Sequence, residues 1–255
     1  MAVTGLALVL FLTFHGSMNV VAVFSGKAYN AICEFLGANW YAVVATIGLA
    51  ALALFHIVYA FILNAQNRRA RGNNRYEVTS KPEKVEWASQ NMLVLGIIIL
   101  LGLGLHLYNF WYKMMFAELF DTQYAAQAAN GILRIQQTFS CPVYCVIYIL
   151  WIAAIWFHLS HGFWSSMQTL GWNGNTWQNR WKMIGLIYVT LLCLMFIFVV
   201  VAFWTGIAPL DGSCGCGGCC GGVCGTCGCG EVCDCATCCK ALCKDACEQV
   251  CCVAL

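Results

Sequence analysis

Five histidines stand in apolar surroundings, and they are all the histidines of the chain. His158 and His161 lie one helical turn apart in a single apolar run. Each of the others stands alone in an apolar run of its own: His15, His56 and His106. A neutral imidazole in hydrocarbon keeps a donor and an acceptor to satisfy, which is costly without a partner. Each ring therefore requires a hydrogen-bond partner, a proton path or a metal centre.

The segments that hold these histidines are typical of a membrane protein. The sequence is 61% hydrophobic and 9% charged, whereas a soluble domain carries about a quarter charged residues. A transmembrane helix needs about 20 apolar residues. The sequence therefore predicts five spans, at residues 2–25, 39–65, 90–113, 142–167 and 183–207. The expected fold is an all-α bundle of five transmembrane helices within residues 1–209, and the net charge of +2 indicates no nucleic-acid partner.

Basic residues predict the orientation of the chain in the membrane. The densest positive cluster follows the second span and comprises Arg68, Arg69, Arg71, Arg75, Lys81 and Lys84. The positive-inside rule places this loop in the cytoplasm, so we expect the N-terminus inside and the C-terminus outside. Arg180 and Lys182 then fall on the cytoplasmic side as well. The first apolar run is too long for a signal peptide and has no basic residue before it, so we expect no cleavable leader.

The depth of each histidine predicts which rings can meet. His15 and His106 lie about two thirds of the way along spans that run outward, and His56 and His158 about two thirds along spans that run inward. Two pairs at two depths are what two bis-histidine haems need, with one imidazole on each side of each iron. A single histidine in such a helix is more often hydrogen-bonded to a neighbouring helix or part of a proton path. Four of them, one per span and matched in depth, favour haem ligation.

The fourth predicted span offers two candidate ligands. We favour His158, because Gly162 lies one turn further on and leaves room for a flat ring. His161 would then hydrogen-bond a haem propionate or belong to a quinone or proton route, and the reversed assignment stays open. Gly102 precedes His106 by one turn, where it either leaves room for a flat ring, as at Gly162, or serves ordinary helix packing. Because no Cys-x-x-Cys-His motif is present, the haems are expected to be of b type.

Several motifs around these histidines resemble one family. They are Leu-Thr-Phe-His at residues 12–15, Leu-Phe-His at 54–56, Gly-Leu-His-Leu-Tyr-Asn-Phe-Trp at 104–111 and Phe-His-Leu-Ser-His-Gly at 157–162, together with residues 34–41 and 85–93. These motifs resemble the dihaem cytochrome b membrane anchor of succinate:quinone oxidoreductases, which are succinate dehydrogenases and fumarate reductases. The resemblance is to the single-subunit, five-helix form of Bacteroidetes and related bacteria, and it covers residues 1–207.

This resemblance implies ligand pairing of the first span with the third and of the second with the fourth. It implies that the chain carries electrons between a quinone, expected to be menaquinone, and an iron–sulfur subunit through two b haems. A flavoprotein with covalent FAD and an iron–sulfur protein would bind on the cytoplasmic side. FAD and iron–sulfur clusters would therefore belong to these partners, and this chain would do no dicarboxylate chemistry itself. The expected location is the bacterial inner membrane, in contact with lipid, with a dimer of heterotrimers as a further expectation.

Glu34 is the candidate proton acceptor at the quinone. A quinol releases two protons with its two electrons, so its site needs a base near a haem. Glu34 is the only acid in the first outer loop, just before the second span. By resemblance, a carboxylate at the outer start of that span takes part in quinol oxidation. The alternative, a solvated acid at the membrane interface, stays open.

The chain departs from that family at both ends. It starts almost at Thr4, where relatives have a cytoplasmic stretch, and it ends in a Cys- and Gly-rich tail at residues 210–255 with 15 of the chain's 19 cysteines. Cys-x-x-Cys and Cys-x-Cys spacings suit Zn²⁺, Cu(I) or iron–sulfur clusters. Disulfides are equally compatible with an outer location. A low-complexity appendage without a role in the core activity is the third interpretation.

Two other function classes remain open from the sequence. One is a dihaem cytochrome b of another enzyme, such as a hydrogenase or formate dehydrogenase, although those usually place two ligands on one helix. The other is a proton-coupled transporter with buried histidines and no redox cofactor. A reduced-minus-oxidised spectrum separates the transporter from the cytochromes, and co-purification of a flavoprotein separates the cytochromes from each other.

Overall fold

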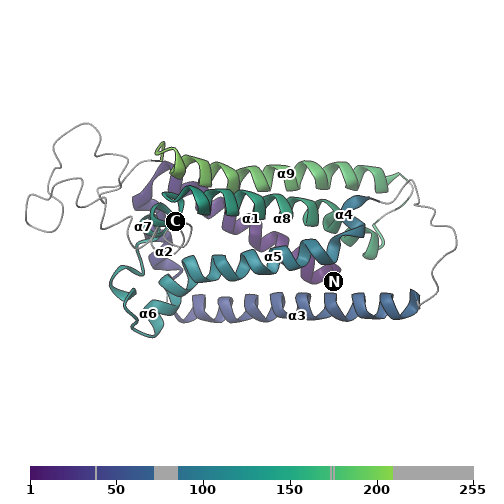
Figure 1. Ribbon diagram of the computed structural model, residues 1–255, viewed down its shortest axis with the longest axis horizontal. Coiled ribbons are helices and arrows are strands. Elements are labelled where there is room, and N and C mark those ends of the chain that lie inside the picture. Colours follow the sequence, from purple (N-terminus) through teal and green to yellow (C-terminus); the bar gives the residue numbers. More distant parts are fainter. Residues whose placement is uncertain (38, 72–85, 173, 175, 209–255) are drawn as a thin grey trace, which may run out of the picture. The chain divides into compact units, whose positions relative to one another are not determined.

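The computed structural model describes residues 1–37, 39–71, 86–172, 174 and 176–208, and this part of the chain is all-helical (Figure 1). The elements in chain order are α1 (Ala2–Phe24), α2 (Gly26–Phe35), α3 (Trp40–Arg71), α4 (Trp87–Gln90), α5 (Met92–His106), η1 (Leu107–Phe116), α6 (Ala117–Leu119), η2 (Ala125–Gln127), α7 (Gly131–Phe139), α8 (Pro142–Thr169) and α9 (Trp177–Trp204). The predicted Cys-rich tail lies outside the described residues. So do Arg75, Lys81 and Lys84.

Five segments are long and apolar enough to cross a membrane, so the chain is a multi-pass membrane protein. They are Ala2–Phe24, Trp40–Ala70, Met92–Leu119, Pro142–Thr169 and Trp177–Trp204. The five predicted spans are thereby confirmed, although two helices extend beyond their apolar cores. α3 continues to Arg71 and α9 begins at Trp177, because a helix can continue through residues such as Arg, Gln and Lys that hydropathy alone excludes.

The third span changes its helical type in the middle. α5 ends at His106, and the next ten residues, Leu107–Phe116, form a π-helix. In a π-helix each amide bonds the carbonyl five residues earlier, and such stretches are rare and often lie at functional sites. The apolar pattern of this span contains no signal for the change.

The described chain divides into two compact units. The first comprises Met1–His15, Trp40–Leu103 and Trp151–Leu194, and the second comprises Gly16–Asn39, Gly104–Leu150 and the chain from Met195. Four of the five spans therefore contribute residues to both units. Each unit is described by itself below.

Tryptophan and glycine organise the packing of the first unit. The indole of Trp151 on α8 covers Gly102 on α5 so closely that a Cβ at Gly102 would collide with the ring. The indole N–H donates to the carbonyl of Ile99 at 3.1 Å. Gly102 is thus a packing residue here, and a tryptophan side chain occupies the room that the sequence analysis considered for a flat ring. Trp156 similarly donates to Thr190 on α9 at 3.0 Å.

Two short amphipathic helices, α2 and α7, pack together in the second unit. The Asn130 side chain caps α7 by accepting from the amide of Leu133 at 3.1 Å. Asn30 on α2 accepts from the amide of Ile132 at 3.0 Å and donates to Asn130 at 3.2 Å. Two of the first amides of α7 are thereby satisfied by side chains, which fixes where this helix begins.

Replacing Gly131 by alanine is expected to destabilise the protein by about 1–3 kcal/mol, the usual cost of overpacking. A Cβ at Gly131 would lie 2.7 Å from the Tyr29 ring and still closer to the sulfur of Cys33. The measurement is thermal unfolding in detergent. Gly48→Ala is the matched control, because a Cβ there meets nothing within 4 Å. Equal stability of the two variants would contradict the close packing of α2 on α7.

Candidate functional site

The contacts of His56 on α3 define which of its two ring nitrogens carries the proton. Its Nδ1 lies 3.0 Å from the hydroxyl of Thr4 on α1. That hydroxyl donates its one proton to the carbonyl of Met1 at 2.9 Å, so it must accept from His56. The proton of His56 is therefore on Nδ1, and Nε2 keeps an available lone pair. An imidazole oriented in this way is prepared to bind a metal through Nε2.

His158 on α8 belongs to the same unit as His56, and the two imidazoles lie within electrostatic range of each other. The Nδ1 atom of His158 is buried and has no hydrogen-bond partner within the described part of the chain. A Cβ at Gly162, one turn further on, would meet nothing within 4 Å. Buried polar atoms in proteins are nearly always satisfied, so this ring fits a role toward a bound group better than a role in packing.

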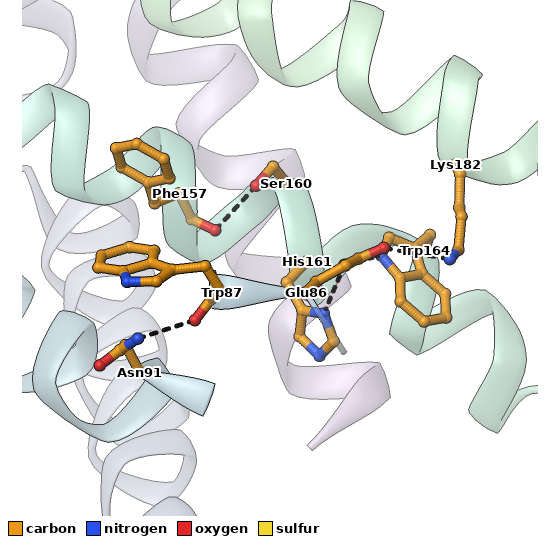
Figure 2. A network of polar contacts seen from close by, with 8 residues as sticks. All are labelled: Glu86, Trp87, Asn91, Phe157, Ser160, His161, Trp164 and Lys182. Atoms are coloured by element: carbon orange, nitrogen blue, oxygen red, sulfur yellow. Dashed lines mark hydrogen bonds and ion pairs between the residues drawn. The ribbon is translucent and has the colours of Figure 1, made fainter. Parts of the chain in front are cut away.

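His161 lies in a network centred on Glu86, which Figure 2 shows. One carboxylate oxygen of Glu86 accepts from Nδ1 of His161 at 3.1 Å and from the indole of Trp164 at 3.2 Å. The other accepts from the ammonium of Lys182 on α9 at 3.1 Å. A carboxylate that holds Nδ1–H leaves Nε2 with its lone pair, as in many metal-binding histidines. On the fourth span, a carboxylate orients the ring of His161, whereas Nδ1 of His158 has no partner among the described residues, so the reversed assignment keeps its physical basis.

The Glu86 network also joins three segments of the first unit. Partial burial alone would raise the pKa of Glu86, but hydrogen bonds from His161, Lys182 and Trp164 and the charge of Lys182 lower it below its ordinary value. The Lys182 ammonium lies 4.3 Å from the centre of the Trp164 ring. Glu86 thus stays ionised and fixes the start of the third span against α8 and α9.

His106 is surrounded by aromatic rings of the second unit. Its ring centre lies 5.1 Å from that of Phe110 and 6.2 Å from that of Tyr148. Tyr148 is only 4% exposed, and its hydroxyl accepts from Asn109, which is 3% exposed. Tyr148 also packs edge-on against Phe139 at the end of α7. These contacts hold the beginning of the π-helix against α7 and α8.

His15 stacks on Phe11, with ring centres 5.5 Å apart and planes 15° from parallel. It belongs to the first unit, whereas His106 belongs to the second. The predicted His15/His106 pair therefore stays a prediction. The predicted His56/His158 pair has both rings in one unit and within electrostatic range.

Glu34 lies at the end of α2 and is exposed. A turn at Leu36 and Gly37 follows it, and the side-chain amide of Asn39 donates to the backbone carbonyl of Glu34 at 3.2 Å. A second acid, Glu118, lies beside the same turn, with a carboxylate oxygen 2.9 Å from where a Cβ of Gly37 would be. The role of Glu34 as a proton acceptor stays a prediction, and Glu118 is a nearby acid that the sequence analysis did not consider.

The sequence analysis missed several polar residues near the candidate histidines. They are Glu86 and Trp164 beside His161 in the first unit, and Tyr148, with its partner Asn109, beside His106 in the second. The sequence did offer a reason to consider Glu86. It is the last charged residue before the third span, and Lys182, of opposite charge, is the last charged residue before the apolar part of the fifth. No cluster of three or more His, Cys, Asp or Glu residues occurs within the described ranges. A haem iron needs only two protein ligands, so pairs of histidines are the relevant arrangement.

The chain matches no protein-family model, and no curated protein and no solved structure is detectably similar to it. The family resemblance of the histidine motifs therefore stays a prediction from those motifs.

Proposed function

We propose that this protein is the membrane-anchor cytochrome b subunit of a succinate:quinone oxidoreductase. In this role it carries electrons between a quinone, menaquinone by resemblance, and an iron–sulfur partner. The observation that carries the proposal is the state of His56. Thr4 holds its Nδ1 proton, its Nε2 lone pair is available, and it lies within electrostatic range of His158 on another span.

The proposal assigns two b haems to four of the histidines. His56 and His158 would hold the inner iron, and His15 and His106 the outer iron. When bound, such groups supply one-electron carriers within the membrane. Thr4 orients His56, and the open space at Gly162 leaves room beside His158. His161, held by Glu86 through Nδ1, keeps an Nε2 lone pair that fits proton transfer, whereas donation to a haem propionate would need the doubly protonated ring.

The orientation and the partners belong to the same proposal. The basic residues at the end of α3, Arg68 and Arg69, face the cytoplasm of a bacterium by the positive-inside rule. A flavoprotein and an iron–sulfur protein dock on that side and carry FAD, the clusters and the dicarboxylate chemistry. The opposite side holds the quinone near Glu34, whose carboxylate accepts a proton from the quinol.

The test is the reduced-minus-oxidised spectrum of the purified chain, with haem counted by the pyridine haemochrome method. We expect b-type bands and two haems per polypeptide. A protein without a Soret band would refute the proposal and favour a histidine-containing transporter. Two b haems without a co-purifying flavoprotein would favour the cytochrome of another quinone-linked enzyme.

A further inference from the structure

Three tryptophan rings surround a hollow in the connection between α8 and α9. The hollow has a volume of about 310 Å³ and is lined by Gly171, Trp172, Gly174, Trp177 and Trp181. The rings of Trp172 and Trp181 are stacked with their centres 6.3 Å apart, and the ring centre of Trp177 lies 5.8 Å from that of Trp181. Such a volume lies within the range of small-molecule sites.

The end of α8 fixes the first of these rings. Gly171 has a φ of +81°, and its amide donates to the carbonyl of Gln168 at 3.0 Å. The amide of Trp172 donates to the carbonyl of Met167 at 3.0 Å. These two bonds form the Schellman arrangement, in which glycine supplies the left-handed residue. The indole N–H of Trp181 on α9 donates to the carbonyl of Trp172 at 2.9 Å, so hydrogen bonds to the backbone hold both segments of the hollow in place.

A cation lies beside the hollow and has no acidic partner among the described residues. The guanidinium of Arg180 lies 5.2 Å from the centre of the Trp177 ring. Glu86 is the one acid that the structure describes in the first unit, and its carboxylate already accepts from Lys182. Arg180 is exposed and forms no ion pair within the described part of the chain. The surroundings of the hollow are therefore positive.

These groups select an anion over a cation. Aromatic rings attract cations, but Arg180 already lies over Trp177 and would repel a second positive charge in the hollow. An indole N–H is only a donor, and a guanidinium offers several donors in a geometry that matches phosphate. The preferred ligand is therefore a negatively charged group with several acceptor oxygens.

The position of the hollow favours a lipid phosphate over a free phosphate ion. The hollow lies between the end of the span Pro142–Thr169 and the beginning of the span Trp177–Trp204. Tryptophans at such ends typically lie at the level of the lipid headgroups. Indole walls offer apolar surface to the glycerol and acyl chains of a lipid, but they cannot replace the hydration of a free ion. Basic pockets between transmembrane helices are known to bind anionic headgroups.

We propose that the three tryptophans of the hollow, together with Arg180, bind the headgroup of an anionic phospholipid. Arg180 pairs with the phosphate, and the indole rings pack against the glycerol and the beginning of the acyl chains. No haem and no quinone takes part in this contact, so the inference does not depend on the proposed function.

The experiment is native mass spectrometry of the full-length protein, purified and delipidated in detergent. The protein is titrated with phosphatidylglycerol or with phosphatidylcholine of the same acyl chains. We expect phosphatidylglycerol to bind more tightly, and Arg180→Gln to weaken its binding about fivefold, the usual effect of one basic residue at an anionic lipid. The affinity for phosphatidylcholine should stay unchanged in that variant. Trp177→Leu should weaken the binding of both lipids, because it removes one wall of the hollow.

Two control variants match these substitutions. Arg68→Gln removes another exposed charge of the first unit, at the end of α3. Trp204→Leu removes a tryptophan from the other end of α9 that is 46% exposed, against 47% for Trp177. Neither control should change the affinity for phosphatidylglycerol. Inorganic phosphate in large excess should not displace the bound lipid.

Each other outcome overturns the proposal. Equal affinities of the wild-type protein for the two lipids would exclude an anionic lipid as the preferred ligand and leave this surface to a soluble partner. Equal losses in Arg180→Gln and Arg68→Gln would assign the binding to the overall surface charge. Displacement by inorganic phosphate would show that the ion alone is the ligand. Because the haem content enters none of these results, failure of the proposed function is distinguishable from failure of this inference.

Discussion

Replacing His56 by alanine is expected to remove one of the two haems and to leave the other in place. His56 supplies the available Nε2 lone pair, and alanine has no group that can replace it. His158→Ala should remove the same haem, because the two rings lie within electrostatic range in one unit. The measurement is the haem-to-protein ratio, which should fall from two to one in each variant. The bands that remain should be the same in both.

Two further variants serve as controls for this result. Thr4→Val keeps the ligand but removes the hydrogen bond that orients it, so we expect haem to bind about 10–100-fold more weakly, as for other partners of ligating histidines. His161→Ala should keep both haems. A haem lost in His161→Ala but kept in His158→Ala would assign the ligand to His161, which Glu86 holds. Two haems retained in all three histidine variants would refute ligation by this pair.

Glu34→Gln is expected to lower quinol-linked turnover by about 10²–10⁴-fold, the usual contribution of a general base. Glutamine keeps the size and polarity of the side chain but cannot accept the proton of a quinol at this position. Both haems should remain, because Glu34 is exposed and lies on α2, outside the spans. The measurement is quinol oxidation by the complete complex, with haem content determined on the same sample.

Glu118→Gln is the matched control for this prediction, because Glu118 lies beside the same turn of the chain. Normal turnover in that variant would separate the role of Glu34 from a general loss of negative charge at this surface. Normal turnover in Glu34→Gln would refute the assignment of Glu34. Loss of activity only in Glu118→Gln would transfer the role of proton acceptor to Glu118.

The membrane-spanning architecture could be predicted from the sequence, because it depends on the length of apolar runs. The lengths of those runs gave all five spans, and their histidines were visible as single polar residues within them. The contacts of the polar residues could not be predicted in the same way. Glu86 meets His161, Trp164 and Lys182 across separations of 75, 78 and 96 residues, and nothing local in the chain specifies such partners.

The helix α7 shows a second reason for incomplete prediction. Its first residues lie in a loop of mixed composition between two spans, and hydropathy gives no reason to single them out. Its beginning depends on Asn130 and on Asn30 from α2, one hundred residues earlier. Hydropathy therefore leaves Arg134 in the connection between the third and fourth predicted spans, where a charge is ordinary, although the folded chain buries it.

The π-helix after His106 has a consequence for how the length of this segment can vary. A π-helix accommodates an extra residue per turn, so it is the form that a helix takes after absorbing an inserted residue. Deletion of one residue from Leu107–Phe116 would allow an ordinary α-helix with stronger hydrogen bonds. A deletion before Asn109, at Leu107 or Tyr108, would also rotate everything beyond it and carry Asn109 away from Tyr148. The π-helix thus has weaker backbone hydrogen bonds than an α-helix would have, but its side chains keep the directions that their contacts need. We therefore expect the insertion or deletion of a residue in this stretch to be less tolerated than the exchange of one apolar residue for another.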